Sequence, residues 1–326
     1  MARALITGVA GFIGSTLAER LLSEGWQVRG LDNFDPYYER AIKERNLRNC
    51  ESNAAFELHE GDLAGIDLRP LVADVDGVFH LAARPGVRRS WGATFREYVH
   101  ANVLATQRLL EALVERPQVR LVFASSSSVY GQAEEPLAVE TAPRRPISPY
   151  GVTKLAGEAL VGAYHVNHGI PAVMLRYFTV FGPRQRPDMA MHRFLRALLA
   201  GDEIEIYGDG RQTRDFTFIE DAVDATVRAF HRGRPGACYN IGGGSPASVL
   251  EVIEILAAAT GRRPRSRLAA AQPGDPRSTR ADVGRARADL DFRPRVGLEE
   301  GLHRMTAWMA QVGMPAPAAG TNHESA

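Results

Sequence analysis

The chain has 326 residues and a formal net charge of +1, because 39 basic residues nearly balance 38 acidic ones. Charged residues make up 24% of the chain with the signs interspersed, which excludes a disordered polyelectrolyte and gives no sign of nucleic-acid binding. Apolar residues make up 45%, as in globular proteins, and no run approaches the roughly 18 apolar residues that a membrane span needs. Cys50 and Cys238 alone form neither a disulfide framework nor a metal cluster, so we expect a cytoplasmic protein without metal.

Strand-like and helix-like segments alternate through the first half of the chain. Short apolar runs predict strands at residues 4–7, 27–31, 77–81, 119–123 and 172–177. Apolar residues at helical spacing predict helices at residues 12–24, 95–115 and 150–167. This alternation is typical of βαβ units, so the sequence predicts an α/β fold with a Rossmann-type, doubly wound parallel sheet.

The character of the sequence changes near residue 182, where segments become shorter and glycine, proline and arginine more frequent. We therefore expect residues 1–180 to form a cofactor-binding domain, with some later segments returning to it. Residues 181–314 should form mainly a smaller, mixed α/β substrate domain. Residues 315–326 are rich in proline and alanine, a composition that predicts a disordered tail.

A glycine-rich turn, Gly8-Val9-Ala10-Gly11-Phe12-Ile13-Gly14, follows the first predicted strand and opens the first predicted helix. Glycines there let the backbone turn tightly and approach a pyrophosphate at the helix N-terminus. Such spacing also occurs in an ordinary strand–turn–helix. However, Asp32 ends the second strand, where a carboxylate accepts hydrogen bonds from an adenosine ribose and repels a 2′-phosphate. Together these features predict NAD as the cofactor, in preference to NADP.

The ends of the next strands provide further candidate cofactor contacts. These are Asn33 after the strand at residues 27–31, Asp62 and Leu63 after a further strand that ends before Gly61, and Leu81, Ala82 and Ala83 at the end of the strand at residues 77–81. Asp32 and Asp62 are also good turn residues. We interpret His80, just before Leu81, as a hydrogen-bonded core residue rather than a catalyst.

Tyr150 and Lys154 stand four residues apart on a predicted helix, so their side chains share one face. Of the 39 basic residues only Lys43 and Lys154 are lysines, which indicates positions where arginine is chemically unsuitable. Four serines, at residues 125–128, follow the strand predicted at residues 119–123 and include Ser126, at the sheet edge where ligands bind. A cation about 5 Å from the phenol supplies ~3 kcal/mol of the ~4 kcal/mol needed to make it a base near neutral pH.

At these residues the chain resembles the extended short-chain dehydrogenases/reductases, specifically the NAD-dependent nucleotide-sugar epimerases and dehydratases, over about residues 3–310. The resemblance implies bound NAD, with Tyr150 as the base, Lys154 as its activator and ribose ligand, and Ser126 as the polarising hydroxyl. It also implies that the C4 hydroxyl of a sugar is oxidised, that the 4-keto sugar rotates, and that the hydride returns to its other face.

Within this family the chain is most similar to the UDP-glucuronate 4-epimerases. Residues 31–38 (LDNFDPYY) and 186–190 (RPDMA) resemble theirs, and Ser128 stands where dehydratases and decarboxylases usually carry an acid. Ser127, Ser128 and Thr179 would then hold a C5 carboxylate, with Arg88 or Arg186 adding charge. One departure is Arg184-Gln185, where these epimerases often have Trp-Gly, and it leaves the identity of the sugar open.

The nucleotide end of the substrate has weaker signals. Arg214, in residues 213–216 (TRDF), matches a phosphate ligand of the family, and Arg277 is a second candidate. A solvated surface charge is the competing interpretation of both. Ser90 and Asn102 are expected near the sugar and the sheet.

The leading interpretation is an epimerase that converts UDP-glucuronate to UDP-galacturonate. The family resemblance also implies a homodimer that packs helices 95–115 and 150–167 across its interface. A UDP-glucose or UDP-N-acetylglucosamine 4-epimerase is the first alternative. A one-way reductase that releases NAD and a non-catalytic NAD-binding regulator are others, although a regulator has no need of Ser126, Tyr150 and Lys154.

Overall fold

A seven-stranded parallel sheet forms the centre of the computed structural model, which describes residues 1–132 and 137–313. Its strand order is β10-β6-β5-β4-β1-β2-β3. The strands are β1 (Arg3–Thr7), β2 (Gln27–Asp32), β3 (Phe56–Glu60), β4 (Gly77–His80), β5 (Arg120–Ser126), β6 (Ala172–Tyr177) and β10 (Cys238–Ile241). The order reverses between β1 and β4, so the carboxyl ends of these strands open a crevice for a ligand. The predicted C-terminal tail lies outside the described residues.

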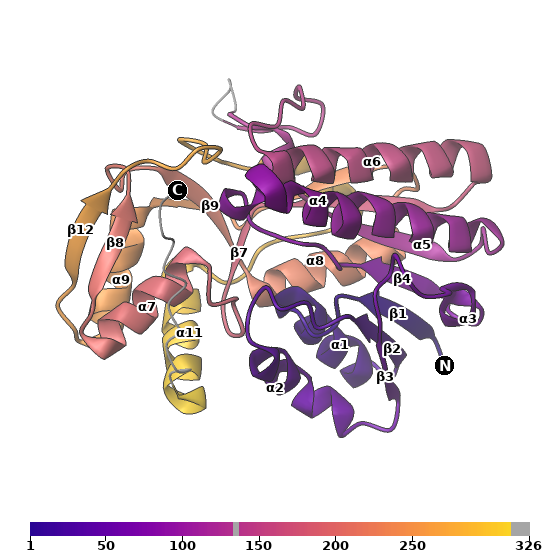
Figure 1. Ribbon diagram of the computed structural model, residues 1–326, viewed down its shortest axis with the longest axis horizontal. Coiled ribbons are helices and arrows are strands. Elements are labelled where there is room, and N and C mark those ends of the chain that lie inside the picture. Colours follow the sequence, from indigo (N-terminus) through magenta and orange to yellow (C-terminus); the bar gives the residue numbers. More distant parts are fainter. Residues whose placement is uncertain (133–136, 314–326) are drawn as a thin grey trace.

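Helices cover both faces of this sheet (Figure 1). One layer contains α1 (Phe12–Ser23), α2 (Arg40–Glu51) and α8 (Ile219–Arg232), and the other contains α3 (Arg69–Val72), α5 (Ala105–Val114) and α6 (Pro149–His168). Because both faces are covered, the central strands are apolar throughout, as in Ala4-Leu5-Ile6, which are fully buried. The predicted Rossmann-type α/β fold is therefore confirmed.

The helix predicted at residues 95–115 is helical but not uniform. It consists of α4 (Phe95–Tyr98), a π-helical stretch (Val99–Leu104) and α5. The π stretch contains Asn102, whose side-chain oxygen accepts from Arg84 N at 2.7 Å and whose amide donates to Thr153 Oγ1 of α6 at 2.9 Å. The local change of helical period thus places an amide between two segments that border the site described below.

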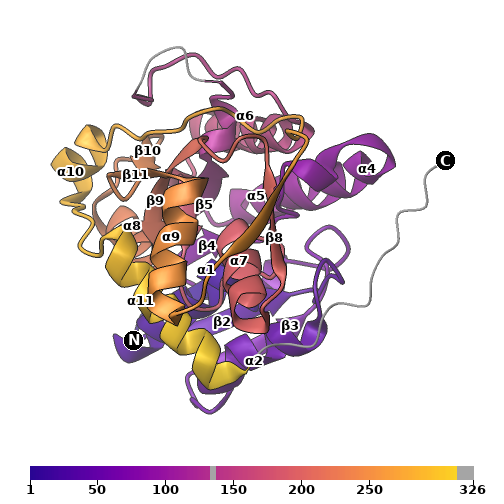
Figure 2. The ribbon, with the colours of Figure 1, turned by 90° about the vertical axis from the view of Figure 1, so that its left-hand side faces the viewer.

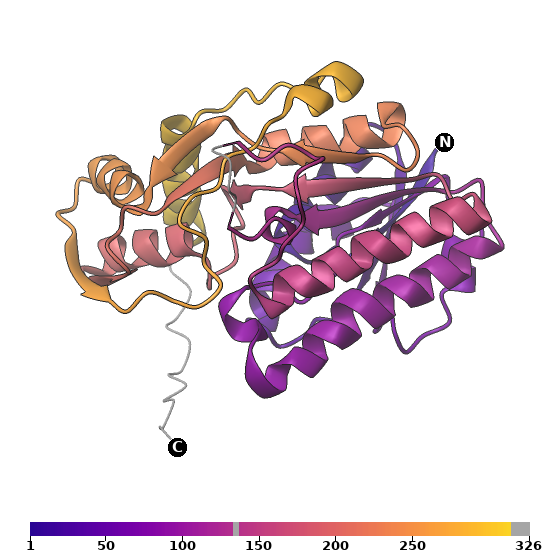
Figure 3. The same ribbon diagram turned by 90° about the horizontal axis from the view of Figure 1, so that it is seen from above.

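A smaller mixed part lies beside the carboxyl ends of the strands (Figures 2 and 3). It contains a three-stranded sheet, β11-β9-β7, and a two-stranded sheet, β12-β8. Its elements are β7 (Thr179–Phe181), α7 (Ala190–Ala200), β8 (Glu203–Tyr207), β9 (Thr213–Phe218), β11 (Ser245–Ser248), α9 (Val249–Thr260), β12 (Arg265–Ala269) and α11 (Leu298–Val312). Between them, α8 and β10 return to the large sheet, and α10 (Gly284–Leu290) packs against both.

A buried ion pair connects α6 to the sheet. Arg176 of β6 donates to Glu158 of α6 through Nε and Nη2, each at 2.8 Å, and the two side chains are only 3% and 1% exposed. Ser125 at the end of β5 donates to the same carboxylate at 2.5 Å. The orientation of α6 relative to β5 and β6 is thereby fixed. Within the described residues, no helix is both long and apolar enough to cross a membrane.

Candidate active site

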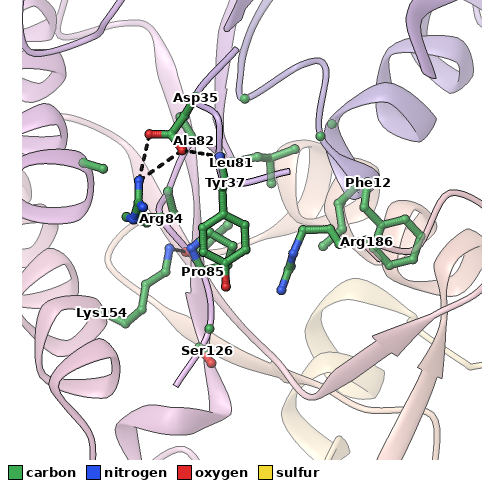
Figure 4. A pocket seen from close by; sticks show the side chains of 18 of the residues that line it. Phe12, Asp35, Tyr37, Leu81, Ala82, Arg84, Pro85, Ser126, Lys154 and Arg186 are labelled. Atoms are coloured by element: carbon green, nitrogen blue, oxygen red, sulfur yellow. Dashed lines mark hydrogen bonds and ion pairs between the residues drawn. The ribbon is translucent and has the colours of Figure 1, made fainter. Parts of the chain in front are cut away.

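A cleft of about 380 Å³ opens where the carboxyl ends of the parallel strands face the smaller part (Figure 4). Residues of β2, β5, β6, β7 and α6 contribute to its walls, together with the segments that directly follow β1, β3 and β4. Every residue that the sequence suggested for the cofactor lies in the lining of this cleft: Gly8, Gly11, Phe12, Ile13, Gly14, Asp32, Asn33, Asp62, Leu63, Leu81, Ala82, Ala83, Tyr150 and Lys154. These predicted cofactor residues alone come from segments up to 146 residues apart in the sequence, from Gly8 to Lys154.

At two positions of the turn after β1, only glycine fits. Gly8 adopts a φ of +72°, and a Cβ there would lie 2.7 Å from the backbone nitrogen of Ala82. A Cβ on Gly14 would lie 2.2 Å from the carbonyl oxygen of Gly8. Gly11, the N-cap of α1, provides no side chain to cap the helix. The first turn of α1 therefore offers its backbone N–H groups to the cleft, an arrangement that fits the pyrophosphate of NAD.

Asp32 lies between this turn and α2. Its Oδ2 accepts from Ala10 N at 3.0 Å and its Oδ1 from Phe34 N at 2.8 Å. Lys43 of α2 also lines the cleft, with Nζ 3.6 Å from Asp32 Oδ1. Lys43 was not predicted to belong to the site. The scarcity of lysine in the chain was the available signal, because its two lysines, Lys43 and Lys154, both line this cleft. Asp32 and Lys43 thus place opposite charges where the ribose of NAD would lie.

Replacing Asp32 by Ala should reverse much of the discrimination between NAD and NADP. The variant loses the carboxylate that repels a 2′-phosphate and keeps the Lys43 cation that attracts one, so the ratio of the two dissociation constants should shift about 10-fold or more toward NADP. Calorimetric titration of both cofactors into stripped protein measures this ratio. Adding Lys43→Met should cancel the gain for NADP; an unchanged ratio in Asp32→Ala would reduce Asp32 to a turn residue.

Tyr150, Lys154 and Ser126 all line the cleft, the first two on α6 and the third at the end of β5. Helix α6 begins at Pro149, and Ser148 caps it by accepting from Gly151 N at 3.1 Å. Lys154 Nζ donates to the carbonyl oxygen of Ala124 at 2.8 Å. This backbone partner fixes the position of the ammonium group, and Figure 4 shows Lys154 and Ser126 in the same pocket.

Burial has the largest effect on the pKa values of Lys154 and Tyr150. Burial lowers the pKa of Lys154 to about 8, against the opposing effect of Glu158 one turn along α6. Burial also raises the pKa of Tyr150, while a hydrogen bond with Ser126 and the charge of Arg186 act to lower it. The sequence assigned the activating charge to Lys154, whereas in the structure Arg186 is the cation that acts to lower the pKa of the phenol.

Removing the phenolic hydroxyl of Tyr150 should abolish most turnover without disturbing the fold. Tyr150→Phe keeps the ring, so the melting temperature and retained NAD should match wild type, while turnover falls at least ~100-fold, the lower end for loss of a general base. Initial rates on the nucleotide sugar measure the effect. Tyr164→Phe, on the same helix but outside the cleft lining, is the matched control and should retain its rate. Wild-type turnover in Tyr150→Phe would remove Tyr150 from the mechanism.

Four residues expected at the sugar also line the cleft: Ser127, Ser128, Thr179 and Arg186. Ser126 Oγ accepts from Ser128 N and donates to Ser128 Oγ, both at 3.1 Å, so the turn after β5 presents a connected set of hydroxyls. Thr179 begins β7, directly after the sheet strand β6. Arg186 pairs with Asp188, its Nε lying 3.0 Å from Asp188 Oδ1.

Three predicted arginines lie outside the lining of the cleft in the described part of the chain: Arg88, Arg214 and Arg277. Arg88 pairs with Asp275 at 2.8 Å, and the same carboxylate acts on the half-buried Arg214, so these two arginines lie near each other. Arg277 is 61% exposed and pairs with Asp209 at 2.9 Å. Arg88 and Arg214 thus lie near the same carboxylate, whereas Arg277 lies on a more exposed surface.

Other polar residues near the site have structural partners. His80 is buried between Thr7 Oγ1 at 2.7 Å and Thr106 Oγ1 at 3.0 Å, and burial lowers its pKa to about 3, so it is a core residue, as the sequence indicated. Ser90 is buried and donates to Val87 O at 2.6 Å. Among the described residues no cluster of histidine, cysteine or acidic side chains has the arrangement of a metal site.

Several lining residues were not predicted: Asp35, Tyr37, Tyr38 and Arg84, besides Lys43. Arg84 pairs with Asp35 at 2.8 Å across the mouth of the cleft (Figure 4) and with Glu97 at 2.6 Å. Asp35, Tyr37 and Tyr38 lie in the segment that marks the similarity to UDP-glucuronate 4-epimerases, so that similarity was the signal that would have found them.

Comparison with known proteins agrees with this fold. The model of the NAD dependent epimerase/dehydratase family matches residues 4–242. An uncharacterized UDP-glucose epimerase, YtcB, of Bacillus subtilis (strain 168) is 43% identical over 94% of this chain and 98% of its own length. A UDP-glucuronate 4-epimerase of Thermodesulfobacterium geofontis (strain OPF15) is 35% identical over 93% of this chain and 95% of its own.

A solved structure is similar over nearly the whole fold. It is UDP-glucuronic acid 4-epimerase from Bacillus cereus in complex with UDP-glucuronic acid and NAD, with a TM-score of 0.93 and 42% identity, covering 95% of this chain and all of that one. The cleft, the Tyr150–Lys154 pair and these matches together define a nucleotide-sugar-modifying enzyme of the short-chain dehydrogenase type. The chain belongs to the NAD dependent epimerase/dehydratase family.

Proposed function

We propose that the protein is an NAD-dependent UDP-glucuronate 4-epimerase that forms UDP-galacturonate. The observation that carries this proposal is the position of Ser127, Ser128, Thr179 and Arg186 in the same cleft as Tyr150 and Lys154. Hydroxyls and a guanidinium are suited to a carboxylate, and the Bacillus cereus structure with UDP-glucuronic acid shares 42% of its sequence with this chain. The carboxylate of the sugar would therefore lie beside the base that acts on its C4 hydroxyl.

In this mechanism the chain positions the sugar and moves one proton. The glycine turn and Asp32 would hold NAD, which when bound would accept the hydride from C4 and return it to the other face of the sugar. Tyr150 removes the proton of the C4 hydroxyl while Ser126 donates a hydrogen bond to the C4 oxygen. After the 4-keto sugar has rotated in the cleft, Tyr150 returns the proton to the C4 oxygen. Lys154, held by Ala124 O, would contact the cofactor ribose and contribute positive charge to the cleft.

Epimerisation needs no second acid or base, whereas elimination and decarboxylation of the 4-keto sugar demand more of the site. Serines rather than carboxylic acids occupy positions 127 and 128, next to Ser126. Their hydroxyls and Thr179 would hold the carboxylate through hydrogen bonds and so keep it from the orientation in which carbon dioxide is lost. This supports simple epimerisation over the other reactions of the family.

Thr179→Val tests the carboxylate site directly. The variant keeps the shape of the side chain and removes one hydrogen bond to a charged group, so kcat/KM for UDP-glucuronate should fall ~10- to 100-fold. Any residual rate on UDP-glucose should change much less. Product analysis by NMR measures both rates and any decarboxylated product, and Thr306→Val on α11 is a control that should leave both unchanged. Equal losses on the two sugars would contradict the hexuronate assignment.

A UDP-glucose 4-epimerase is the second candidate. It is favoured by the 43% identity to the Bacillus subtilis UDP-glucose epimerase and by the departure at Arg184-Gln185. In the structure Arg184 pairs with Glu19 at 2.6 Å, away from the hydroxyl cluster, so the departure leaves that cluster intact. A wild-type preference for UDP-glucose over UDP-glucuronate would select this second candidate.

The remaining site roles are part of the proposal. The cofactor-lining residues named above hold NAD, within an NAD-binding part formed by residues 1–180 with α8 and β10. Most later residues hold the nucleotide sugar, with Arg88, Arg214 and Arg277 as candidate partners of its phosphates. The pair formed by Arg88 and Asp275 would then have to open or be shared when the diphosphate binds.

We further propose a cytoplasmic homodimer. Both cysteines are buried free thiols, which supports a reducing compartment. Exposed apolar side chains lie on the two helical segments predicted at the interface: Phe95, Val99, Leu104, Val152 and Val166. Val166 is 80% exposed, and a second copy would remove such side chains from water.

Sedimentation velocity tests the dimer. Wild type should sediment as a dimer, and Leu104→Glu together with Val152→Glu should shift it toward monomer, because two buried carboxylates per subunit oppose association. Leu268→Glu, at an exposed position on β12, is the matched control and should leave the dimer intact. A monomeric wild type, or variants that all remain dimeric, would contradict this interface.

A further inference from the structure

The two segments that mark the similarity to UDP-glucuronate 4-epimerases meet in space. Tyr37, after β2, donates from Oη to Asp188 Oδ2 at 3.3 Å, although the two residues are 151 positions apart. Arg186 donates to the same carboxylate, with Nε 3.0 Å from Oδ1 and Nη2 3.2 Å from Oδ2. One carboxylate therefore organises a phenol and a guanidinium at the sugar end of the cleft.

These three residues differ in their access to a ligand. Arg186 and Tyr37 line the cleft, and Figure 4 shows them projecting into the same space. Asp188 is not part of the lining in the portion of the chain that the structure describes. Its pairing uses Nε and Nη2 of Arg186, so the second η nitrogen takes no part in it. Asp188 therefore acts on a ligand through Arg186 and Tyr37.

Asp188 also balances a concentration of positive charge. Arg84, Arg89 and Arg186 all lie near the Tyr37 ring, with their guanidinium carbons 5.4, 4.9 and 6.0 Å from its centre. A guanidinium that already holds one carboxylate through two hydrogen bonds binds a second carboxylate less tightly than a free guanidinium does. A substrate carboxylate at Arg186 thus shares this cation with Asp188.

A shared cation suits a reaction in which the carboxylate must change its position. The 4-keto sugar rotates between the two hydride transfers, so its C5 carboxylate leaves one set of contacts and forms another. A clamp that binds this group too tightly in one orientation lowers the energy of that state and slows the step that leaves it. Positive charge in the clamp adds to the preference of the neighbouring hydroxyls for a hexuronate over a neutral hexose.

We propose that Asp188 is a positioning residue that shares Arg186 with the substrate carboxylate, so that Arg186 selects the hexuronate and still releases it for rotation. This inference rests on the proposed hexuronate function. In Asp188→Asn, Arg186 would face the substrate as an unshared cation. Affinity for UDP-glucuronate should rise while turnover falls, a split that general damage to the fold does not produce.

The experiment compares wild type and Asp188→Asn, both loaded with NAD. Calorimetry with UDP-glucuronate should show a dissociation constant lower by about 3- to 10-fold, while that for UDP-glucose changes less than about 2-fold. The kcat for UDP-glucuronate should fall by a comparable factor. Glu97→Gln is the matched control, because it removes a carboxylate from the neighbouring Arg84 and leaves Arg186 paired; it should not separate the two sugars.

A double variant tests whether Asp188 acts through Arg186. In an Arg186→Met background, Asp188→Asn should produce no further selective change in sugar affinity. Equal changes for both sugars, a lower affinity for UDP-glucuronate, or an effect that persists without Arg186 would overturn the proposal. If wild type fails to epimerise UDP-glucuronate, the proposed function fails. Even then, selectively tighter binding of UDP-glucuronate by Asp188→Asn would support the sharing of Arg186, and unchanged binding would overturn that sharing.

Discussion

The catalytic geometry depends on the buried ion pair between Glu158 and Arg176. Glu158 follows Lys154 by one helical turn on α6, and its carboxylate also accepts from Ser125, next to Ser126 on β5. One carboxylate thus joins the helix that carries Tyr150 and Lys154 to the strand end that carries Ser126. Breaking such a buried pair by removing one partner typically costs about 3–5 kcal/mol. The pair continues through Arg176 Nη1 to Tyr130 and through Tyr130 to Asn240 of β10, so the late strand is tied to the same network.

Paired charges recur along the whole cleft. Lys43 lies beside Asp32 at the cofactor end, Arg84 pairs with Asp35 at the mouth, and Arg186 pairs with Asp188 at the sugar end. Each cation is therefore partly neutralised before any ligand binds, although the proposed ligands are anions. Such pairing avoids unpaired buried charge in the cleft, and the hydroxyls of Ser127, Ser128 and Thr179 add neutral hydrogen-bonding groups beside these ion pairs. The same principle explains how a cleft can bind a charged sugar and still let it move.

Features that depend on local chemistry were predictable from the sequence. The glycine turn, Asp32, the Tyr150–Lys154 spacing and the serines after β5 are local patterns, and the strand–helix alternation defines the sheet that brings them together. Pairings across the fold were not predictable, because they depend on which of 37 arginines meets which acid. Arg84 and Asp188 therefore escaped notice, whereas Arg277, singled out by its neighbours in sequence, pairs with Asp209 outside the cleft lining. The π-helical stretch at Val99–Leu104 was hidden for the same reason, since its apolar spacing is that of an ordinary helix.

The central claim is that one hydrogen leaves C4 of UDP-glucuronate and returns to C4 without exchanging with water. It is tested most directly with UDP-glucuronate that carries deuterium on C4, incubated with the purified enzyme in ordinary water and followed by NMR and mass spectrometry. The account predicts UDP-galacturonate that retains the deuterium at C4, with the sugar carboxylate intact. Product that contains solvent hydrogen at C4, product that has lost carbon dioxide, or no conversion of UDP-glucuronate would contradict it.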